Sequence, residues 1–285
     1  MRAGVRLLSM ATSSTKRRIL RQLLERPLEW EPGREARITP TGEQLLFVSF
    51  VAERWLQAAP GGPLDFDSGE AEKAIAALVD GWAYSIVHTI ARQPMSLQQL
   101  DAALPELGEP AIRRRLTALR QARLVELRPA GAEAGGLYAP TDWLRAGIAP
   151  LAAAARLERR DPKPAMVPID ALDVEAAFLL TLPLLELPAG VAGPCRLGVE
   201  IGEEDRPDGL AGVTARVEAG RVTACATRLD DSTGTWAIAS AGDWLDTLIE
   251  PGAKRVRTGG DRVLAASLLA QLRKTLFGIA AKESR

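Results

Sequence analysis

The sequence predicts an α+β protein in which two copies of a helix-and-hairpin unit precede a separate module of strands and helices. A basic amphipathic helix followed by a turn-rich hairpin occurs twice in the first half, with the same order of elements. The charged, proline-rich stretch at residues 160–168 is typical of a domain boundary. From residue 194 on, apolar and polar residues alternate as they do in strands. We therefore expect three parts, at residues 1–60, 69–160 and 168–281.

The composition is that of an ordinary globular protein. Hydrophobic residues make up 47% and charged residues 25% of the 285 positions, so the chain can bury substantial cores without a disulfide or a metal. We find no stretch long and apolar enough to cross a membrane and no signal-peptide pattern, which predicts a cytoplasmic protein. Residues 1–160 hold 22 Lys plus Arg against 18 Asp plus Glu, a mild basic bias within a net charge of zero. This bias permits DNA binding without demonstrating it.

Residues 109–140 predict a helix that leads directly into a two-stranded hairpin. The residues on the apolar face of this helix are Ile112, Leu116, Leu119 and Arg123, and the apolar pattern continues as a strand at Leu124, Val125 and Leu127. The residues on the opposite face are Arg113, Arg114, Thr117 and Gln121. Two arginines and two uncharged hydrogen-bonding side chains on one face suit the DNA major groove, although a solvated amphipathic helix shows the same pattern.

An earlier copy of this arrangement lies near the N-terminus. This copy begins with the helix TKRRILRQLLER and its cap. The side chains that face outward there are Ser14, Arg17, Arg18 and Arg21. Two short strands follow around the turn at residues 31–34, with Arg34 at the tip. At one fixed offset, the arginine pairs of the two helices align. Thr41 then begins another helix and has capping-box spacing to Gln44.

The second copy has further helices, predicted at residues 71–92, 96–104 and 141–159. The positions that carry a family resemblance in this region are Gly81, Trp82, Pro94, Ser96, Leu97 and Leu100. With the segment TPTGEQL of the first copy, they resemble the HxlR-type regulators within the MarR-like winged-helix group. The resemblance covers roughly residues 1–160 and implies two tandem winged helix-turn-helix units that bind double-stranded DNA.

The sequence departs from that family pattern in two places. The first unit lacks an opening helix, and the tip of the second hairpin, AGAEAGG, carries Glu133 and no cation. A wing commonly offers Arg or Lys to phosphate, and a carboxylate would repel it. Which of the two units reads DNA therefore stays open.

The C-terminal part predicts a helix from residue 170 to about residue 184, which Pro183 would kink or end, and then a sheet with two more helices. The predicted strands are CRLGVEIG, LAGVTARVEAG, RVTACATRL, GTWAIAS and KRVRTGG, and the predicted helices are AGDWLDTLIEP and DRVLAASLLAQLRKTLFG. A wide apolar helix over a meander sheet is an α+β module.

This order of elements is similar to that of the sterol carrier protein fold. The matching segments are residues 233–237, residues 243–245 and the GGD at residues 259–261 before the last helix. The resemblance implies an apolar tunnel for a hydrophobic small molecule. The candidate lining residues are Phe178, Leu182, Trp236, Trp244, Leu268 and Leu272. Aromatic and leucine residues at such spacing also occur in a plain hydrophobic core.

The sequence contains no motif of a nucleophilic, nucleotide-binding or metalloprotease site. Two separate cysteines and one histidine are too few ligands for a zinc site of the usual kind. We therefore expect no catalytic residue, no metal and no cofactor.

Together these patterns predict a homodimeric transcriptional regulator whose winged helices bind double-stranded DNA and whose C-terminal domain senses a hydrophobic small molecule, with no membrane partner. The alternative is a lipid-binding or drug-binding protein whose winged helices serve protein-protein contacts. An enzyme is a third possibility, which the lack of a catalytic motif disfavours.

Overall fold

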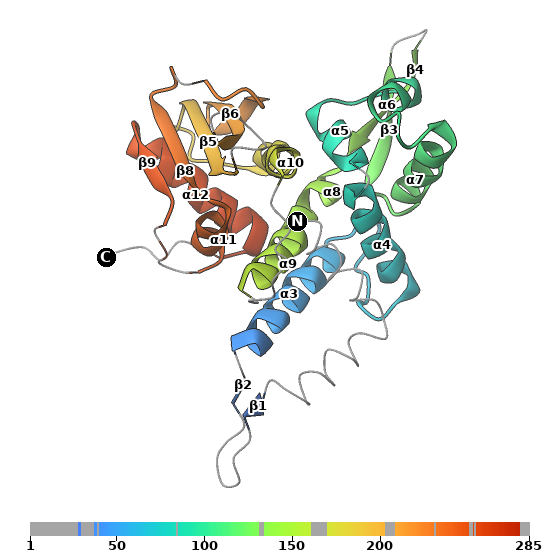
Figure 1. The fold of residues 1–285 in the computed structure, drawn as a ribbon, viewed down its shortest axis with the longest axis horizontal. Coiled ribbons are helices and arrows are strands. Elements are labelled where there is room, and N and C mark those ends of the chain that lie inside the picture. The colour runs from blue at the N-terminus through green and yellow to red at the C-terminus, as the bar shows by residue number, and fades with distance from the viewer. Residues whose placement is uncertain are drawn as a thin grey trace. The chain divides into compact units, whose positions relative to one another are not determined.

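The computed structural model describes residues 28–29, 37–38, 40–83, 85–130, 134–160, 170–202, 209–230, 232–250, 253 and 255–279. Over these residues the chain is a mixed α+β protein (Figure 1). It divides into two compact units: unit 1 holds residues 1–86 and 96–167, and unit 2 holds residues 87–95 and 168–285. Among the described residues, no single helix is long and apolar enough to cross a membrane, and one pair, α4 (Gly69–Ala83) and α5 (Ile86–Arg92), passes that test only when the two helices are taken together across a bend.

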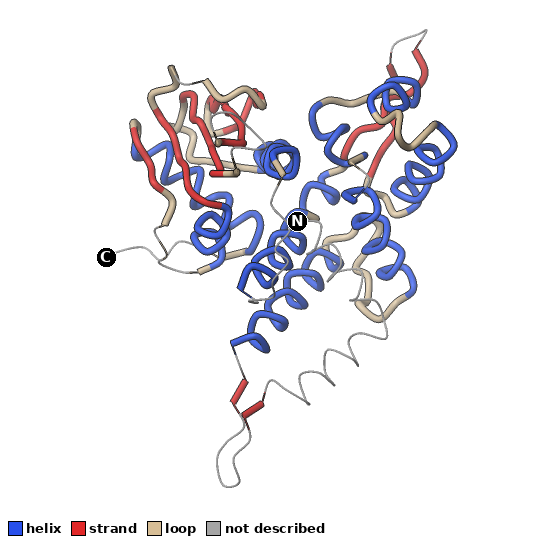
Figure 2. The backbone as a smooth tube through the Cα atoms, in the orientation of Figure 1, coloured by secondary structure: helices blue, strands red, loops and turns tan. Residues whose placement is uncertain are grey.

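Unit 1 is mostly helical (Figure 2). Its elements are β1 (Leu28–Glu29), β2 (Arg37–Ile38), α3 (Pro40–Gln57), α4 (Gly69–Ala83), α6 (Leu97–Ala103), α7 (Glu109–Gln121), β3 (Val125–Ala130), β4 (Ala134–Pro140), α8 (Asp142–Ala146) and α9 (Ile148–Arg160). Strands β1 and β2 pair antiparallel, as do β3 and β4. The β1–β2 pair flanks the predicted turn at residues 31–34, which lies outside the described residues.

Two predicted helices are each broken into two. The helix expected over residues 71–92 ends as α4 and resumes as α5 (Ile86–Arg92), because Ser85 has φ 60°, a left-handed conformation that cannot continue a right-handed helix. The helix expected over residues 141–159 is split at Gly147 into α8 and α9. The Gly147 N–H donates to the carbonyls of Trp143 and Leu144, so the chain turns tightly there.

Helix α3, assigned from the sequence to a separate first domain, packs within unit 1 instead. Trp55 of α3 stacks on Trp143 of α8, with ring centroids 4.7 Å apart, and each indole Nε1–H donates to the other residue's carbonyl at 2.9 Å. Both tryptophans are buried. Helix α3 therefore shares a core with helices of the part predicted at residues 69–160, and the predicted boundaries at residues 1–60 and 69–160 stay a prediction.

The start of α3 also differs from the prediction. The helix begins at Pro40, where the missing N–H of proline is harmless, so Thr41 lies inside the first turn instead of capping it. Gln44 Oε1 accepts from Arg156 Nη1 of α9 at 3.4 Å. The structure therefore places Thr41 one residue inside the helix, whereas the sequence places it at the start.

Over its described residues, unit 2 contains most of helix α5, a five-stranded sheet and three further α-helices. Its elements are α10 (Ala171–Thr181), the short 3-10 helix η1 (Leu182–Leu184), β5 (Gly193–Glu200), β6 (Leu210–Glu218), β7 (Arg221–Ala226), β8 (Thr235–Ser240), α11 (Ala241–Ile249), β9 (Arg257–Gly259) and α12 (Arg262–Phe277). The strand order is β7-β6-β5-β8-β9. Strands β5 and β8 are parallel and the other neighbours antiparallel, so the sheet is a meander only from β5 to β7.

Local residue chemistry sets the boundaries of these elements. The β6–β7 turn places Ala219 and Gly220 at φ 48° and 76°, and a Cβ at Gly220 would lie 2.4 Å from the Leu187 carbonyl oxygen. The Asp261 carboxylate accepts from the N–H groups of Val263 and Leu264 and so caps α12.

The sheet has a covered face and an outward face. Cys195, Leu197 and the residues paired with them are buried, and a Cβ on Gly193 of the same face would lie 3.4 Å from Leu264 of α12. The helices therefore cover this face. The intervening residues face outward, and one row of paired residues across β8, β5, β6 and β7 consists of Trp236, Arg196, Thr214 and Ala226.

Candidate nucleic-acid interface

Helices α6 and α7 follow one another in unit 1, joined by residues 104–108. Ser96 caps α6 by accepting from the Gln99 N–H at 3.2 Å, and the Gln99 side chain accepts from the Ser96 N–H at 2.8 Å. Leu100 of α6 is fully buried. The chain then enters α7 through Gly108, which has φ 68°. This geometry fixes the direction of α7 relative to α6.

The two faces of α7 are those that the sequence predicts. Ile112, Leu116 and Leu119 are at most 1% exposed. The residues on the opposite side that the structure shows as exposed are Arg113, Arg114, Thr117 and Gln121. All four side chains predicted for the second helix-and-hairpin copy are thus brought together on one convex helical surface of unit 1, which we call the α7 face.

Two residues of the α7 face have partners within the helix. The Arg113 guanidinium donates to the Glu109 carboxylate one turn earlier, and this hydrogen bond raises the pKa of Arg113. Thr117 Oγ1 donates to the Arg113 carbonyl at 2.8 Å. Exposed pairs of this kind contribute little to stability, so a phosphate can replace Glu109 at small cost. Within the described residues, the side chains of Arg114 and Gln121 form no hydrogen bond or ion pair.

A third arginine, which sequence reasoning missed, belongs to the same surface. Arg120 is exposed and follows Arg113 by two helical turns, so the two lie on the same side of α7. The signal was present in the spacing. Arg120 extends the basic part of the α7 face toward its C-terminal end.

The antiparallel hairpin β3–β4 follows this helix, and we use the name wing for these two strands only as a label. Arg128 of β3 is exposed and its Nε lies 2.7 Å from Glu126 Oε1, which makes it a second cation missed by sequence reasoning. Leu127 is 44% exposed, and its side chain lies over Gly136 of β4. A Cβ on Gly136 would be 2.5 Å from the Leu127 side chain. The tip at residues 131–133, with Glu133, lies outside the described residues.

An open hollow of about 940 Å³ separates the end of α7 from the wing. Its lining includes Thr117, Arg120 and Gln121 of α7 and Glu126 and Leu127 of β3. Thr141 holds the end of the wing by donating to the Leu124 carbonyl at 2.9 Å and by accepting from the Leu144 N–H at 3.2 Å. Helix and wing are thereby held as two neighbouring projections with space between them.

Arg123, which the sequence placed on the apolar face of this helix, has a different role. The helix ends at Gln121, and Arg123 has φ 58° in the turn that follows. Its guanidinium donates to the carbonyl of Pro60 in the segment after α3. The prediction fails because the helical spacing was continued past the end of the helix.

The candidates in the first copy cannot be placed in the same way. Ser14, Arg17, Arg18, Arg21 and Arg34 lie outside the described residues. They remain predictions.

Five of the six predicted ligand-lining residues lie in the core of unit 2. Phe178, Leu182, Trp244, Leu268 and Leu272 are all buried. The rings of Phe178 and Trp244 meet edge to face with centroids 5.4 Å apart, and Trp244 Nε1 donates to the Gly198 carbonyl at 2.7 Å. In this structure the five side chains therefore act as packed core.

Trp236 does not join the other five. It is paired with Arg196 on the outward face of the sheet, and a Cβ on Gly259 would lie 2.5 Å from its ring. Trp236 and Trp244 therefore cannot line one common tunnel here. The error arises because residues on neighbouring positions of a strand point to opposite faces.

The described residues contain no group of three or more His, Cys, Asp and Glu placed to hold a metal ion. Burial raises the pKa of both cysteine thiols to about 12, so neither is activated as a nucleophile near neutral pH. His88 Nε2 of α5 lies 3.1 Å from Asp173 Oδ1 of α10, and both side chains are buried within unit 2. We attribute this contact to structure, because it places the imidazole against a carboxylate in the interior of unit 2.

No protein-family model, curated protein or solved structure matches this chain. The functional argument therefore depends on the geometry of the described residues.

Proposed function

We propose that the protein is a DNA-binding transcriptional regulator that responds to a small molecule bound by unit 2. The α7 face carries this proposal. It combines three exposed arginines with Thr117 and Gln121 on a helix that follows α6 in a helix-turn-helix and precedes a wing. Arginine reaches guanine edges or phosphates, and glutamine can pair with adenine, so the surface fits a major groove.

Regulation requires a link between the two units, and the path of the chain supplies one. Helix α5 directly follows α4 of unit 1, but residues 87–95 belong to unit 2, after which the chain returns to unit 1 at α6. Within unit 2, His88 contacts Asp173, and Arg92 Nη2 donates to Thr227 Oγ1 at 3.5 Å. A ligand that shifts α10 or the loop at Thr227 would change the position of α5 and, through the chain, that of α6. Such a ligand would bind one conformation of the protein more tightly than the other, which is what coupling between two sites requires.

A homodimer is part of the proposal. On α3, Leu46 and Phe50 are 43% and 60% exposed and lie one turn apart. Glu43 and Arg54 are exposed at either end of the same stripe. If two copies of α3 pair antiparallel, Leu46 meets Phe50 of the other copy and Glu43 meets Arg54, so the stripe is self-complementary. Sedimentation of wild type and Phe50→Glu should give a dimer and a monomer, respectively, and a monomeric wild type would contradict this part.

The proposal is tested by DNA binding measured against salt. Binding of a duplex from upstream of the protein's own gene is followed by fluorescence anisotropy at several salt concentrations. We expect affinity to fall steeply with salt, because phosphate contacts release counterions. Arg114→Gln should weaken binding on the order of tenfold and reduce the salt slope by roughly one. A flat salt response in wild type would contradict the proposal.

A matched control separates the α7 face from general charge. Lys73 is exposed on α4 of unit 1, and Lys73→Gln removes the same charge as Arg114→Gln. The control should change affinity less than about twofold, since a distant exposed charge acts only through the screened field. Equal losses in the two variants would mean that binding is merely electrostatic and that α7 does not read DNA. If Arg114→Gln has no effect while wild type binds, then Arg17 and Arg18 of the first copy become the candidates.

The second candidate function is binding or sequestration of a lipid or drug by unit 2, with unit 1 serving protein contacts. The exposed pair Leu46 and Phe50 favours it, because large apolar side chains on an otherwise polar surface are typical of protein interfaces. Tight binding of a hydrophobic dye without any DNA binding would support this candidate against the first.

A further inference from the structure

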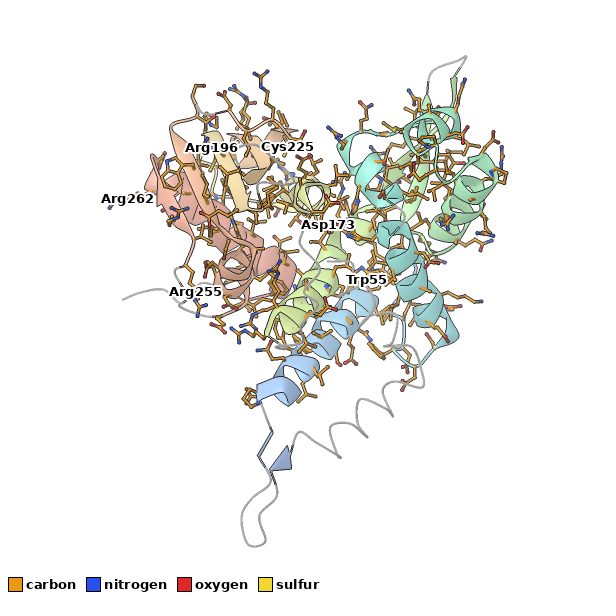
Figure 3. All side chains as sticks on the ribbon, in the orientation of Figure 1. Trp55, Asp173, Arg196, Cys225, Arg255 and Arg262 are labelled. Carbon is orange, nitrogen blue, oxygen red and sulfur yellow. The ribbon has the colours of Figure 1, made fainter. Side chains whose placement is uncertain are left out.

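The outward face of the unit 2 sheet contains a hollow that none of the sequence patterns indicated. Its volume is about 930 Å³. It lies where β6 and β7 meet the loop that leads to β8, and its lining residues are Pro194, Thr214, Ala215, Arg216, Ala224, Cys225, Ala226, Arg228, Leu229, Asp230, Ser232, Thr233 and Gly234. Figure 3 labels Cys225 and the neighbouring Arg196 in this part of unit 2. We call it the sheet hollow.

Two arginines of the sheet hollow have guanidinium groups without a hydrogen-bond or ion-pair partner among the described residues. Arg216 and Arg228 are exposed, and within the described residues neither side chain forms an ion pair or a hydrogen bond. Arg196 lies in the adjacent row of the outward face, beside Thr214. Guanidinium groups bind carboxylates and phosphates through paired N–H donors. The hollow therefore offers an anion at least two suitable cations.

The acidic residue of the hollow is already engaged. Asp230 Oδ1 accepts from the Ser232 N–H at 2.9 Å and from the Ser232 hydroxyl at 2.6 Å. These bonds lower the pKa of Asp230, with smaller contributions from Arg228 and Arg196. The Asp230 N–H in turn donates to Thr214 Oγ1 at 3.0 Å. Asp230 thus holds the loop in shape through its bonds to Ser232 and Thr214. Its carboxylate is not an exclusive partner of Arg216 and Arg228.

The remaining lining is apolar. Pro194 of β5 and Ala224 and Ala226 of β7 belong to the outward face of the sheet, and Leu229 comes from the loop. A ligand that fits this lining needs an acidic group for the arginines and a hydrophobic body for the proline, alanine and leucine side chains. A simple inorganic anion would leave the apolar part unused.

We infer that the sheet hollow binds a small organic acid with a hydrophobic body, held through its acidic group by Arg216 and Arg228. This inference deepens the proposed function, because it names the class of molecule that unit 2 would sense and places its site on the outward face of the sheet. The site is separate from the buried aromatic core around Trp244.

Two dyes that differ only in an acidic group test the inference on the full-length protein. Anilinonaphthalenesulfonate has an aromatic body with a sulfonate, and phenylnaphthylamine has the same body without it. Fluorescence titration should show that the Arg216→Gln, Arg228→Gln double variant binds the sulfonate dye more weakly by on the order of tenfold per arginine. Its affinity for the neutral dye should stay unchanged.

The matched control is Arg262→Gln, which removes an exposed arginine at the start of α12 (Figure 3). This variant should bind both dyes like wild type. Far-ultraviolet circular dichroism of each variant verifies the fold. Unchanged binding of the sulfonate dye by the double variant, or an equal loss for both dyes, would overturn the inference.

Competition titrations against the sulfonate dye distinguish an organic acid from a free inorganic anion as the ligand. Octanoate should displace the sulfonate dye from wild type at far lower concentration than inorganic phosphate does, because only octanoate fills the apolar lining. Equal displacement by phosphate would overturn the requirement for a hydrophobic body. Because no DNA is present in these titrations, their failure leaves the DNA proposal standing, and a failure of DNA binding leaves dye binding unaffected.

Discussion

The two units both expose arginines, but on surfaces of opposite shape. On the α7 face of unit 1, Arg113, Arg114 and Arg120 project from a convex helix next to a wing. In unit 2, Arg216 and Arg228 line a hollow between strands and a loop. A convex basic surface can enter the groove of a duplex, whereas a hollow admits only a small molecule. The same residue type therefore suits two different proposed functions, and the surface shape is what distinguishes the two proposals.

The largest expected effect concerns the independence of the two units. Trp55→Ala removes one half of the stacked, mutually hydrogen-bonded pair with Trp143 in the core of unit 1. We expect the variant to lose roughly 3–5 kcal/mol of unfolding free energy, as for other buried tryptophans. DNA binding should be lost with it. Urea unfolding followed by tryptophan fluorescence measures the change.

Unit 2 provides the internal control for this variant. Because the Trp55–Trp143 pair packs wholly within unit 1, the sulfonate dye should still bind Trp55→Ala with nearly wild-type affinity. Trp55→Phe keeps an aromatic ring but loses the Nε1–H donor, so its unfolding free energy should lie between those of wild type and Trp55→Ala. Joint loss of dye binding would show that the two units fold as one, and the comparison between them would then fail.

A smaller effect is expected in the loop of the sheet hollow. Thr214 Oγ1 donates to the Arg228 carbonyl at 3.0 Å and accepts from the Asp230 N–H at 3.0 Å, so it fixes the loop that carries Arg228. Thr214→Val has nearly the same volume but removes both bonds. We expect the affinity for the sulfonate dye to fall roughly two- to fivefold. Thr258→Val on β9, an exposed residue outside the hollow, should have no effect on the titration.

The smallest effect distinguishes the two faces of the sheet. Cys195 lies on the covered face next to Arg196 on the outward face, and burial raises the pKa of its thiol from 9.0 to about 12. In the unfolded chain the thiol ionises near 9.0, so the folded state holds its proton more tightly. The free energy of unfolding should therefore fall as the pH rises from about 9 toward 12.

Cys195→Ala isolates the contribution of this thiol. Other groups also titrate at alkaline pH, so the decisive quantity is the difference between wild type and variant in the urea midpoint at pH 8 and pH 10. We expect the midpoint of wild type to drop more than that of the variant. An equal drop would mean that the thiol is accessible to water in the native state.

Much of the fold followed from sequence periodicity and punctuation. The strands and helices of unit 2 lie where alternating and helical patterns predict them, and α6 and α7 begin near the predicted helix starts. The failures have specific physical causes. A positive φ at Ser85 breaks a helix whose apolar pattern runs on unbroken, and the stacking of Trp55 on Trp143 joins regions that sequence patterns assign to separate domains. Neither feature has a local sequence signal.

The candidate site was only partly predictable. The outward side chains of α7 follow from helical spacing, and the same spacing would have included Arg120. The sheet hollow depends on strand register, on the parallel pairing of β5 with β8 and on the loop after β7. These are long-range features. Trp236 was grouped with Trp244 because both are aromatic, although register places it on the other face of the sheet.

The central claim is that unit 1 reads DNA through α7 while unit 2 binds a small acid on its sheet. A crossed measurement tests it most directly, with duplex affinity and sulfonate-dye affinity determined for two variants. The Arg113→Gln, Arg114→Gln, Arg120→Gln variant should lose most of its DNA affinity and keep its dye affinity. The Arg216→Gln, Arg228→Gln variant should show the reverse. If either variant loses both affinities together, or neither, the account is contradicted.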